Sequence, residues 1–471
     1  MRTLLHWLRR DLRVEDNTAL FQAARDADRV VPVFILDDTY LRDSNVGPSR
    51  FRFLRECLAE LSAALEKIGG RLVLRPGPAS RALPQLLSET RAAGVYANAE
   101  IGPYPERRDA EARAAVEAAG GRFRLFPAAL LVEPDALTTA SGNPYTVYTP
   151  FAKKWMAAEK RDPLPRPSDL ATPALRSVPL SKPRAWRDLA ADPLSPRGGE
   201  TAARALLDTF FRGPAARYSA DRDRPDRAAT SRLSPHLHFG TISPRTIRAA
   251  AEGAFLEAAP AARASIRKYV AELAWREFTH HVLFHFPRVA EESFQPRFDR
   301  LAWREDPAAV DAWKRGATGY PLVDAAMREL SATHWMHNRA RMVAASFLTK
   351  DLHVHWKLGE KWFEHELADA DLASNNGGWQ WAAGSGTDAA PYFRIFNPIL
   401  QSRRFDPQGL YTRRFLPELS RVPREKIHAP WTMTGKEQRA AGCVIGRDYP
   451  APIVDHARER EVALQLLEEA R

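Results

Sequence analysis

Side chains that could bind or react with a ligand are concentrated in one short stretch of the C-terminal half. Asp369 and Asp371 precede an Asn-Asn-Gly-Gly segment at 375–378, and Trp379 and Trp381 follow it. Asparagine and glycine tolerate left-handed backbone and allow a ligand to approach the chain closely. On a helix, Trp379 and Trp381 would point about 200° apart. One indole could therefore line a cavity while the other packs into the core.

A second segment places three different functional groups on one face of a helix. Glu272, Trp275 and Arg276 have the spacing i, i+3 and i+4, so a helix would present a carboxylate, an indole and a guanidinium together. This group could bind a heteroaromatic ligand. It could equally be an amphipathic edge with an intrahelical Glu–Arg ion pair.

The same spacing recurs at Asn338, Arg341 and Met342, while Arg339 would point elsewhere. An amide beside a guanidinium in an otherwise apolar helix needs hydrogen-bond partners. The phosphates of a ligand or a carboxylate elsewhere in the fold could supply them.

A basic segment follows at 392–424. It carries seven arginines against Asp406 and Glu418, a net charge of +5, with phenylalanines between them. This pattern favours a surface that follows the phosphates of a nucleic acid. A solvated basic face is the alternative.

Two groups of histidines have spacings that a metal site could use. Glu277, His281 and His285 are spaced i, i+4 and i+8, and His353 lies two residues before His355. Neither group matches H-E-x-x-H, and no cysteine joins them, so we expect no metal. The absence of G-x-S-x-G likewise argues against a serine hydrolase.

The N-terminal part of the chain has a different pattern, in which short apolar runs alternate with segments of helical periodicity. This alternation is typical of βαβ units in a doubly wound parallel sheet, whose ligands bind at the carboxyl ends of the strands. Neither G-x-G-x-x-G after the first strand nor G-x-x-x-x-G-K-[ST] occurs, so an ordinary dinucleotide site is not expected. We expect strands at 3–7, 30–36, 72–75, 95–98 and 123–126, and helices at 49–68, 80–93 and 105–119.

We divide the chain into an α/β domain at 1–130, an extended connector at 131–200 and an all-α domain at 201–471. Six prolines between residues 163 and 183 favour extended backbone in the connector. Beyond residue 200, amphipathic stretches at 261–286, 322–330 and 335–348 predict helices. Twelve of the 13 histidines and nine of the 12 tryptophans lie in this last domain, so we expect the chemistry there.

Composition limits the cellular context and the partners. The 471 residues are 45% apolar, too apolar for a disordered chain, and contain neither a membrane-spanning run nor an N-terminal signal pattern. Cys57 and Cys443 are the two cysteines, which excludes a disulfide framework and predicts the cytoplasm. A net charge of +11 favours a polyanionic partner such as nucleic acid, although an arginine-rich chain can also reflect a GC-rich genome.

The motifs together resemble the photolyase/cryptochrome family, specifically its class I enzymes that act on cyclobutane pyrimidine dimers. The similarity runs from LLHWLRRDLRVEDNTAL through SGNPYTVYTPF, TSRLSPHLHFG, ELAWREF and TGYPLVDAAMREL to WMHNRARM and DLASNNGGWQWAAGSGTDAAPYFRIFNP. It covers nearly the whole chain. The resemblance implies an α/β antenna domain and a helical domain that holds FAD without a Rossmann glycine loop.

The resemblance also implies which residues hold the FAD. Asn375 would lie beside flavin N5, and Arg341 would pair with Asp369. The other positions that match the family's FAD site are Tyr218, Thr230, Ser231, Arg232, Leu233, Ser234, Tyr269, Ala370 and Asp371.

A substrate face is implied as well. A base must leave the stack before chemistry can reach it, and a damaged base costs least to extrude. Excited, fully reduced and anionic FAD would give an electron to the extruded dimer, and the electron would return after the ring splits. The positions that match this face are Glu272, which would hydrogen-bond the thymine edges, Trp275, Arg276, Asn338, Arg339, Met342, Trp381 and Gln401.

Trp379, Trp356 and Trp303 match the family's tryptophan chain, which carries electrons from the surface to an oxidised flavin. A second chromophore is expected in the N-terminal domain. Folate-using relatives carry Cys-Lys where Val289-Ala290 stand here, and an asparagine where Pro105 precedes Glu106. The segment AEIGPYPERRDAEA is more similar to deazaflavin-using relatives, so we expect a deazaflavin.

We therefore expect a monomeric, cytoplasmic photolyase that repairs cyclobutane pyrimidine dimers in DNA. The alternative is a cryptochrome-type blue-light receptor that binds FAD without repair, against which Asn375 and the WMHNR sequence stand. The enzyme for pyrimidine–pyrimidone photoproducts pairs two histidines where His337-Asn338 stand here. A basic DNA-binding protein without cofactor is a third alternative.

Overall fold

A computed structural model describes residues 1–181, 189, 193–388 and 395–469. They form two compact units, which are described separately. Unit 1 comprises Met1–Arg217, Ser231–Pro287 and Ala368–Ala373, and unit 2 comprises Tyr218–Thr230, Arg288–Leu367 and Ser374–Arg471. The domain boundaries expected at residues 130 and 200 stay predictions. Among the described residues, no helix combines the length and the apolar character that crossing a membrane requires.

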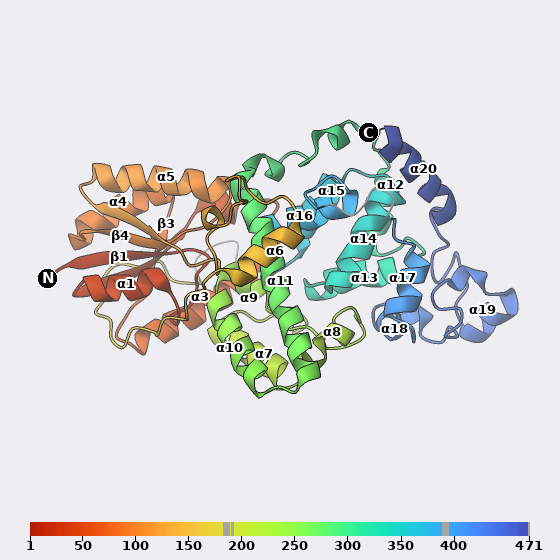
Figure 1. The fold of residues 1–471 in the computed structure, drawn as a ribbon, viewed down its shortest axis with the longest axis horizontal. Helices are drawn as coiled ribbons and strands as arrows, with labels where there is room; N and C mark the ends of the chain where they lie inside the picture. The colour runs from red at the N-terminus through yellow and green to blue at the C-terminus, as the bar shows by residue number, and fades with distance from the viewer. Residues whose placement is uncertain (182–188, 190–192, 389–394, 470–471) are drawn as a thin grey trace. The chain divides into compact units, whose positions relative to one another are not determined.

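The N-terminal part of unit 1 is a parallel sheet with the strand order β3-β2-β1-β4-β5 (Figure 1). Its strands are β1 (Thr3–Leu8), β2 (Arg29–Leu36), β3 (Val73–Pro76), β4 (Gly94–Asn98) and β5 (Arg122–Phe126). In β1, Leu4 and Leu8 join the core on one face, and Leu5 and Trp7 join the core on the other. Both faces are therefore buried, as the apolar character of the strands requires. The predicted strands are confirmed to within one residue at each end.

Helices cover both faces of this sheet, which confirms the doubly wound architecture (Figure 1). Helices α1 (Thr18–Asp26) and α3 (Pro48–Glu66) pack on one face, and α4 (Ala79–Thr90) and α5 (Pro103–Ala118) pack on the other. Further helices of unit 1, with η marking a 3₁₀ helix, are α2 (Asp38–Leu41), η1 (Pro134–Ala136), α6 (Tyr148–Ala157), α7 (Glu200–Arg212), η3 (Pro214–Arg217), α9 (Ser234–Phe239), α10 (Pro244–Glu257) and α11 (Pro260–His285).

The segment predicted as an extended connector contains a helix, α6, and that part of the prediction is wrong. Phe151 and Trp155 lie one turn apart on α6 and are fully buried against α11. The Phe151 ring meets Phe278 at 5.2 Å, and Trp155 Nε1 donates to the Glu277 carboxylate at 2.6 Å. The proline count concealed this helix because the six counted prolines all lie after it, between residues 163 and 183.

Beyond residue 200 the described chain is helical, as predicted, and the five strands lie before residue 127. Its elements outside unit 1 are α8 (Tyr218–Asp221), η5 (Pro296–Arg300), α12 (Pro307–Arg315), α13 (Pro321–Thr333), α14 (Asn338–Lys350), α15 (Trp356–Glu366), α17 (Pro398–Phe405), α18 (Leu410–Phe415), η6 (Pro417–Leu419), η7 (Pro430–Thr432), α19 (Gly435–Ala441) and α20 (His456–Glu469). Two more, η4 (Pro287–Ala290) and α16 (Leu372–Ala383), begin with residues of unit 1 and continue into unit 2. Helix α14 begins three residues later than predicted because His337 caps it.

Aromatic side chains fill the core of unit 2. The Trp379 ring meets Phe363 at 4.9 Å and Trp313 at 6.1 Å, both at steep angles. On α15, Gly359 leaves space for Trp379, because a Cβ at this position would lie 2.1 Å from Trp379 Cη2. Trp356 is one turn before Gly359 on the same helix face. The indole of Trp379 therefore packs directly on the backbone beside Trp356.

Replacing Gly359 by alanine should overpack this contact and lower the free energy of unfolding by about 1–3 kcal/mol. Urea unfolding followed by tryptophan fluorescence measures the change. Gly253 in α10 is the matched control, because a Cβ there meets nothing within 4 Å and alanine should be neutral or mildly stabilising. Equal stability of the two variants would contradict the close contact.

Candidate functional site

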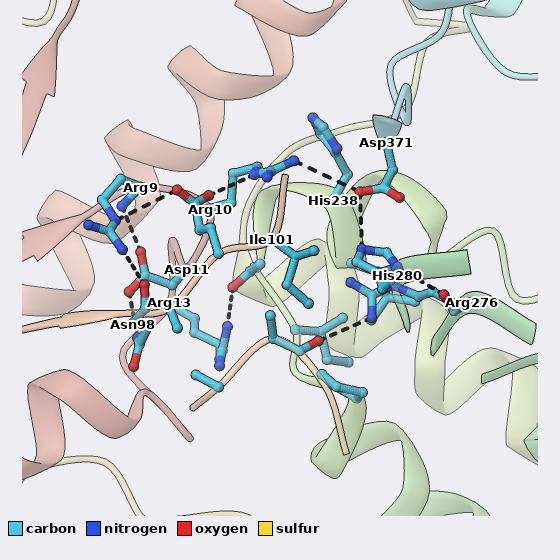
Figure 2. A pocket seen from close by; sticks show the side chains of 18 residues that line it. Arg9, Arg10, Asp11, Arg13, Asn98, Ile101, His238, Arg276, His280 and Asp371 are labelled. Carbon is cyan, nitrogen blue, oxygen red and sulfur yellow. Dashed lines mark hydrogen bonds and ion pairs between the residues drawn. The ribbon is translucent and has the colours of Figure 1, made fainter. Parts of the chain in front are cut away.

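Side chains from several segments of unit 1 meet at the carboxyl ends of β1 and β4 (Figure 2). Arg10 follows β1, Glu100 follows β4, Arg276 and His280 extend from α11, and Asp371 precedes α16. They line a cavity of about 40 Å³, at the edge where open α/β sheets bind ligands. This volume holds a few water molecules and is far too small for a three-ring chromophore. These side chains are therefore packed against one another.

Ion pairs cross this cavity. Arg10 Nε and Arg108 Nη2 donate to the two oxygens of Glu100 at 2.7 and 2.5 Å. Arg10 Nη1 also lies 3.8 Å from Asp371 Oδ2. Burial alone would raise the pKa of Glu100, but Arg108, Arg10 and Arg9 outweigh it and hold this pKa far below its usual value. Glu100 is therefore the ionised centre of an arginine cluster.

His280 connects this cluster to α11. Its Nε2 lies 3.4 Å from Asp371 Oδ2, and its Nδ1 donates to the backbone carbonyl of Arg276 at 2.8 Å. Burial would raise the pKa of Asp371, but His280, Arg276 and Arg10 hold it well below the ordinary range. Asp371 is the counter-charge for Arg276 and Arg10, and its predicted contact with FAD stays a prediction.

The predicted group on α11 does lie on one helical face, where Glu272, Trp275 and Arg276 are half-buried. Trp275 stacks on Tyr148 with ring centroids 3.5 Å apart and planes at 9°. Glu272 lies 3.9 Å from Lys268 Nζ, and Arg276 Nη1 donates to the carbonyl of Ala129 at 3.1 Å. The guanidinium thus turns toward the cavity of Figure 2.

Hydroxyl groups collect in the loop before α9. Tyr269 Oη donates to Ser231 Oγ at 3.1 Å, and burial raises the pKa of Tyr269 to about 12, so this phenol is neutral. Arg232 has the left-handed φ of 53°, and both Arg232 and Ser234 are exposed. Accessible hydroxyls beside a guanidinium suit phosphate oxygens. The residues expected to bind the FAD phosphates therefore fit such a group.

In unit 2, a network of amides fixes the first turns of α16. Asn375 Nδ2 donates to the backbone carbonyl of Glu360 on α15 at 3.0 Å, and this bond orients the Asn375 side chain. Asn376 Nδ2 donates to Glu360 Oε1 at 2.8 Å, and Gln380 Nε2 donates to Asn376 Oδ1 at 3.0 Å. Asn376 and Gln380 were not predicted as site residues, although their i, i+4 spacing was the signal for this network.

The predicted substrate residues on α14 differ in their surroundings. Asn338 is exposed, and its Nδ2 lies 3.7 Å from Met342 Sδ. Arg339 Nη2 donates to Asp223 at 2.9 Å, and its guanidinium lies 4.4 Å from the centroid of the Phe405 ring. Arg339 is therefore held in place by a carboxylate and an aromatic ring.

Trp379 and Trp381 point in different directions, as predicted. Trp379 is 2% exposed in the core, whereas Trp381 is half-buried, with its ring 6.2 Å from that of Phe396. Gln401 on α17 keeps a buried Oε1 that accepts no hydrogen bond from the residues the structure describes. Half-buried polar and aromatic groups of this kind suit a ligand that is both flat and polar.

The site residues expected from the sequence divide between the two units, and their roles stay predictions. Unit 1 holds Ser231, Arg232, Leu233, Ser234, Tyr269, Glu272, Trp275, Arg276, Asp369, Ala370 and Asp371. Unit 2 holds Tyr218, Thr230, Trp303, Asn338, Arg339, Arg341, Met342, Trp356, Asn375, Trp379, Trp381 and Gln401. The predicted pairing of Arg341 with Asp369 stays a prediction, and Arg341 Nε donates to the Met336 carbonyl at 2.8 Å.

The basic segment uses several arginines to hold its own backbone. Tyr392, Phe393 and Arg394 lie outside the described residues. Arg413 donates to the carbonyls of Ser420 and Val422, and Arg424 donates to that of Pro407. Arg403, Arg424 and His428 border an open hollow of about 450 Å³, which leaves positive charge accessible.

Glu277 and His281, which were considered as metal ligands, instead accept hydrogen bonds that hold neighbouring segments of the fold together. Glu277 accepts from the Val132 N–H at 3.1 Å and from Trp155 Nε1 at 2.6 Å. His281 Nε2 accepts the N–H of Tyr145 at 3.1 Å. Within the part of the chain that the structure describes, no three histidine, cysteine or acidic side chains are grouped as a metal site.

Replacing Asp371 by asparagine should lower the free energy of unfolding at pH 7 by about 3 kcal/mol, because buried cations lose their counter-charge. The pKa of Asp371 lies below its unfolded value of about 4, so its stabilising contribution is complete above pH 4 and lost as the pH falls further. The difference between the variant and the parent should therefore shrink at pH 3 in urea unfolding.

Asp162→Asn is the matched control, since the Asp162 side chain is 88% exposed and pairs with Arg248 at the surface. This substitution should change the stability little at either pH. An equal loss in the two variants would exclude Asp371 as a buried counter-charge.

Comparison with known proteins agrees with this arrangement. Residues 4–168 match the model of the DNA photolyase family, and residues 269–469 match that of the FAD-binding domain of DNA photolyase. A deoxyribodipyrimidine photo-lyase of Agrobacterium fabrum is 44% identical over 97% of this chain and 96% of its own length.

Two solved structures have the same fold. A bacterial class III photolyase from Agrobacterium tumefaciens has a TM-score of 0.94 and 42% identity over 100% of this chain and 98% of its own. A cryptochrome of Synechocystis has a TM-score of 0.91 and 31% identity, with 99% of each chain covered. Assignment to class I stays a prediction. The chain belongs to the DNA photolyase/cryptochrome family.

Proposed function

We propose that the chain repairs cyclobutane pyrimidine dimers in DNA by light-driven electron transfer from FAD. One observation carries the proposal. Helix α16 presents the oriented amide of Asn375, a half-buried indole at Trp381 and a core indole at Trp379 within two turns. A half-buried indole suits an extruded base, and the amide suits a flavin ring.

When bound, the reduced, anionic FAD supplies the electron that light transfers to the dimer and accepts it back after the ring splits. The hydroxyls of Thr230, Ser231 and Ser234, with Arg232, would bind its phosphates. Arg341 would pair with Asp369 beside the cofactor. The amide of Asn375 would lie at flavin N5. The neutral phenol of Tyr269 would cover the cofactor without adding charge.

The substrate would be an everted dimer held by a carboxylate and aromatic rings. Glu272 would accept hydrogen bonds from the thymine edges, while Trp275 and Trp381 would pack on the bases. Trp275 is already fixed by its stack on Tyr148, so little side-chain entropy is lost on binding. Arg339 is preorganised by Asp223 in the same way.

DNA binding is supported by charge. The net charge of +11 and the accessible arginines around Arg403 and Arg424 favour contacts with phosphates. Such contacts make affinity fall steeply with salt concentration. The monomeric state and the cytoplasmic location stay predictions from the sequence.

The row of tryptophans in unit 2 would reduce oxidised cofactor before repair. Trp379 packs on the backbone of α15 at Gly359, and Trp356 lies one turn away on the same face. The His355 ring contacts both Trp356 and Trp303, and so connects Trp303 to the other two tryptophans. This geometry supports the route Trp379–Trp356–Trp303 that the resemblance implied.

A second chromophore in the N-terminal domain is also proposed, with a deazaflavin favoured over a folate. The support comes from Val289-Ala290 and Pro105, which depart from the folate pattern. The 40 Å³ cavity of Figure 2 does not admit either molecule with its side chains as they stand.

A cryptochrome-type blue-light receptor is the second candidate, because the Synechocystis cryptochrome shares the fold at 31% identity. The two candidates differ in one measurement. A receptor that binds FAD without repair would leave the dimers of an illuminated oligonucleotide intact.

Trp381→Ala should lower repair of a dimer-containing oligonucleotide under light and weaken its binding in the dark by about 5- to 150-fold, because base stacking contributes about 1–3 kcal/mol. Restored thymines and a fluorescence titration measure the two effects. Trp362→Ala removes a half-buried indole that stacks on His365 and should change neither. Unchanged repair in Trp381→Ala would show that the substrate pocket is elsewhere.

Trp356→Phe and Trp303→Phe should each slow photoreduction of bound, oxidised flavin, because phenylalanine is far harder to oxidise than tryptophan. The loss of flavin absorbance in blue light with a thiol present measures the rate. Protein that was chemically reduced beforehand should still repair DNA. Photoreduction at the parental rate in both variants would refute the proposed route.

A further inference from the structure

A histidine ring lies between two tryptophans of unit 2. The His355 ring meets Trp303 edge to face, with centroids 5.2 Å apart and planes at 70°. It stacks on Trp356 with centroids 5.6 Å apart and planes at 26°. His355 is therefore an aromatic bridge that touches both indoles.

The place of His355 at the start of α15 determines which ring nitrogen carries the proton. His355 is the N-cap residue, and its Nδ1 accepts the backbone N–H of Lys357 at 3.1 Å. A nitrogen that accepts cannot also carry a proton, so the proton of the neutral ring is on Nε2. A second proton would break the cap and place positive charge at the positive end of the helix. The fold therefore favours a neutral ring.

The surroundings act in the same direction. Burial is the largest effect and lowers the pKa of His355, while Asp299 raises it and Lys357 lowers it. Asp299 lies on η5 and Lys357 on α15, and these are the charged groups that face the ring from the described elements packed on it. The imidazole stays uncharged at neutral pH.

We propose that His355 is a positioning residue for electron transfer from Trp303 to Trp356. The proposal rests on the tryptophan route of the proposed function. A Trp356 that has lost one electron regains it from Trp303, so Trp356 is reduced and Trp303 is oxidised; a thiol in solution then reduces Trp303. His355 neither gains nor loses an electron or a proton. Its ring contacts both indoles and so fixes their positions, and because it is uncharged it places no positive charge beside an oxidised indole.

Two variants separate the ring from the helix cap. His355→Asn keeps an oxygen that can accept the Lys357 N–H but removes the ring. His355→Phe keeps an uncharged ring but removes the cap. After a light flash on flavin-loaded protein, the absorbance of oxidised Trp303 should rise several-fold more slowly in His355→Asn and near the parental rate in His355→Phe. The unfolding temperature should fall in His355→Phe and stay nearly constant in His355→Asn.

His365→Asn is the matched control. His365 lies on the same helix and stacks on Trp362, with centroids 6.0 Å apart and planes at 17°, outside the proposed route. This variant should keep the parental rate of Trp303 oxidation. If His355 had only a structural role, the variant with the lower unfolding temperature would also show the slower oxidation of Trp303.

The pH profile gives a second readout. Because the pKa of His355 is lowered from the usual histidine value of about 6.5, protonation should slow the transfer in the parent protein only at a pH below that value. The rate should be independent of pH in both His355 variants. Nitrogen NMR of histidine-labelled protein in the dark should show His355 with its proton on Nε2 at pH 7 and with a pKa below 6.5.

The outcomes separate this inference from the route on which it rests. If Trp303→Phe abolishes the signal while His355→Asn leaves the rate unchanged, the route holds and the role of His355 is refuted. A proton on Nδ1 at pH 7 also refutes it. If neither Trp303→Phe nor Trp356→Phe slows photoreduction, the route and the inference both fail.

Discussion

The compensation of buried positive charge is the constraint on which unit 1 depends. Arg10, Arg108 and Arg276 converge where the sheet meets α11, and Glu100 and Asp371 are their counter-charges. The two contacts to Glu100 are short, at 2.7 and 2.5 Å, so electrostatics as well as apolar packing hold the loops after β1 and β4 together. Asp371 is also the residue before α16, the helix that carries Asn375 and Trp381. The start of the site helix is thus set by the same cluster.

The fold could be predicted from the sequence wherever a pattern depends on local periodicity. Strands such as β1 alternate between two buried faces, and α11 repeats apolar residues every three to four positions, so both were found within a residue or two. Helix α6 was missed because only Phe151 and Trp155 mark its buried face, and their partners Phe278 and Glu277 lie far along the chain. Periodicity also could not show that His337 is the N-cap of α14, where its side chain accepts a backbone N–H and sets the start of the helix.

The helical faces that carry the candidate site residues were predictable, but the contacts of these residues were not, and their roles stay predictions. The spacing of Glu272, Trp275 and Arg276 correctly indicated a shared helical face. That Arg276 turns to the Ala129 carbonyl depends on a loop more than a hundred residues away, and no local pattern contains that information. His355 was considered only as a metal ligand. Its contacts with Trp303 and Trp356, and the hydrogen bond that it accepts from the Lys357 N–H, exist only in the folded structure.

In the proposed electron route, the missing side chain at Gly359 has a consequence for the timing of each transfer. An indole that rests on another side chain shifts whenever that side chain changes rotamer, so its separation from a donor varies over time. Trp379 packs on the rings of Phe363 and Trp313, but on one side it also rests on the main chain of α15 at Gly359, whose hydrogen-bonded ladder permits little displacement. This contact limits the movement of Trp379 relative to α15, the helix that carries Trp356. An electron passing between these two indoles would meet nearly the same barrier width at every attempt, and cooling should change that width very little.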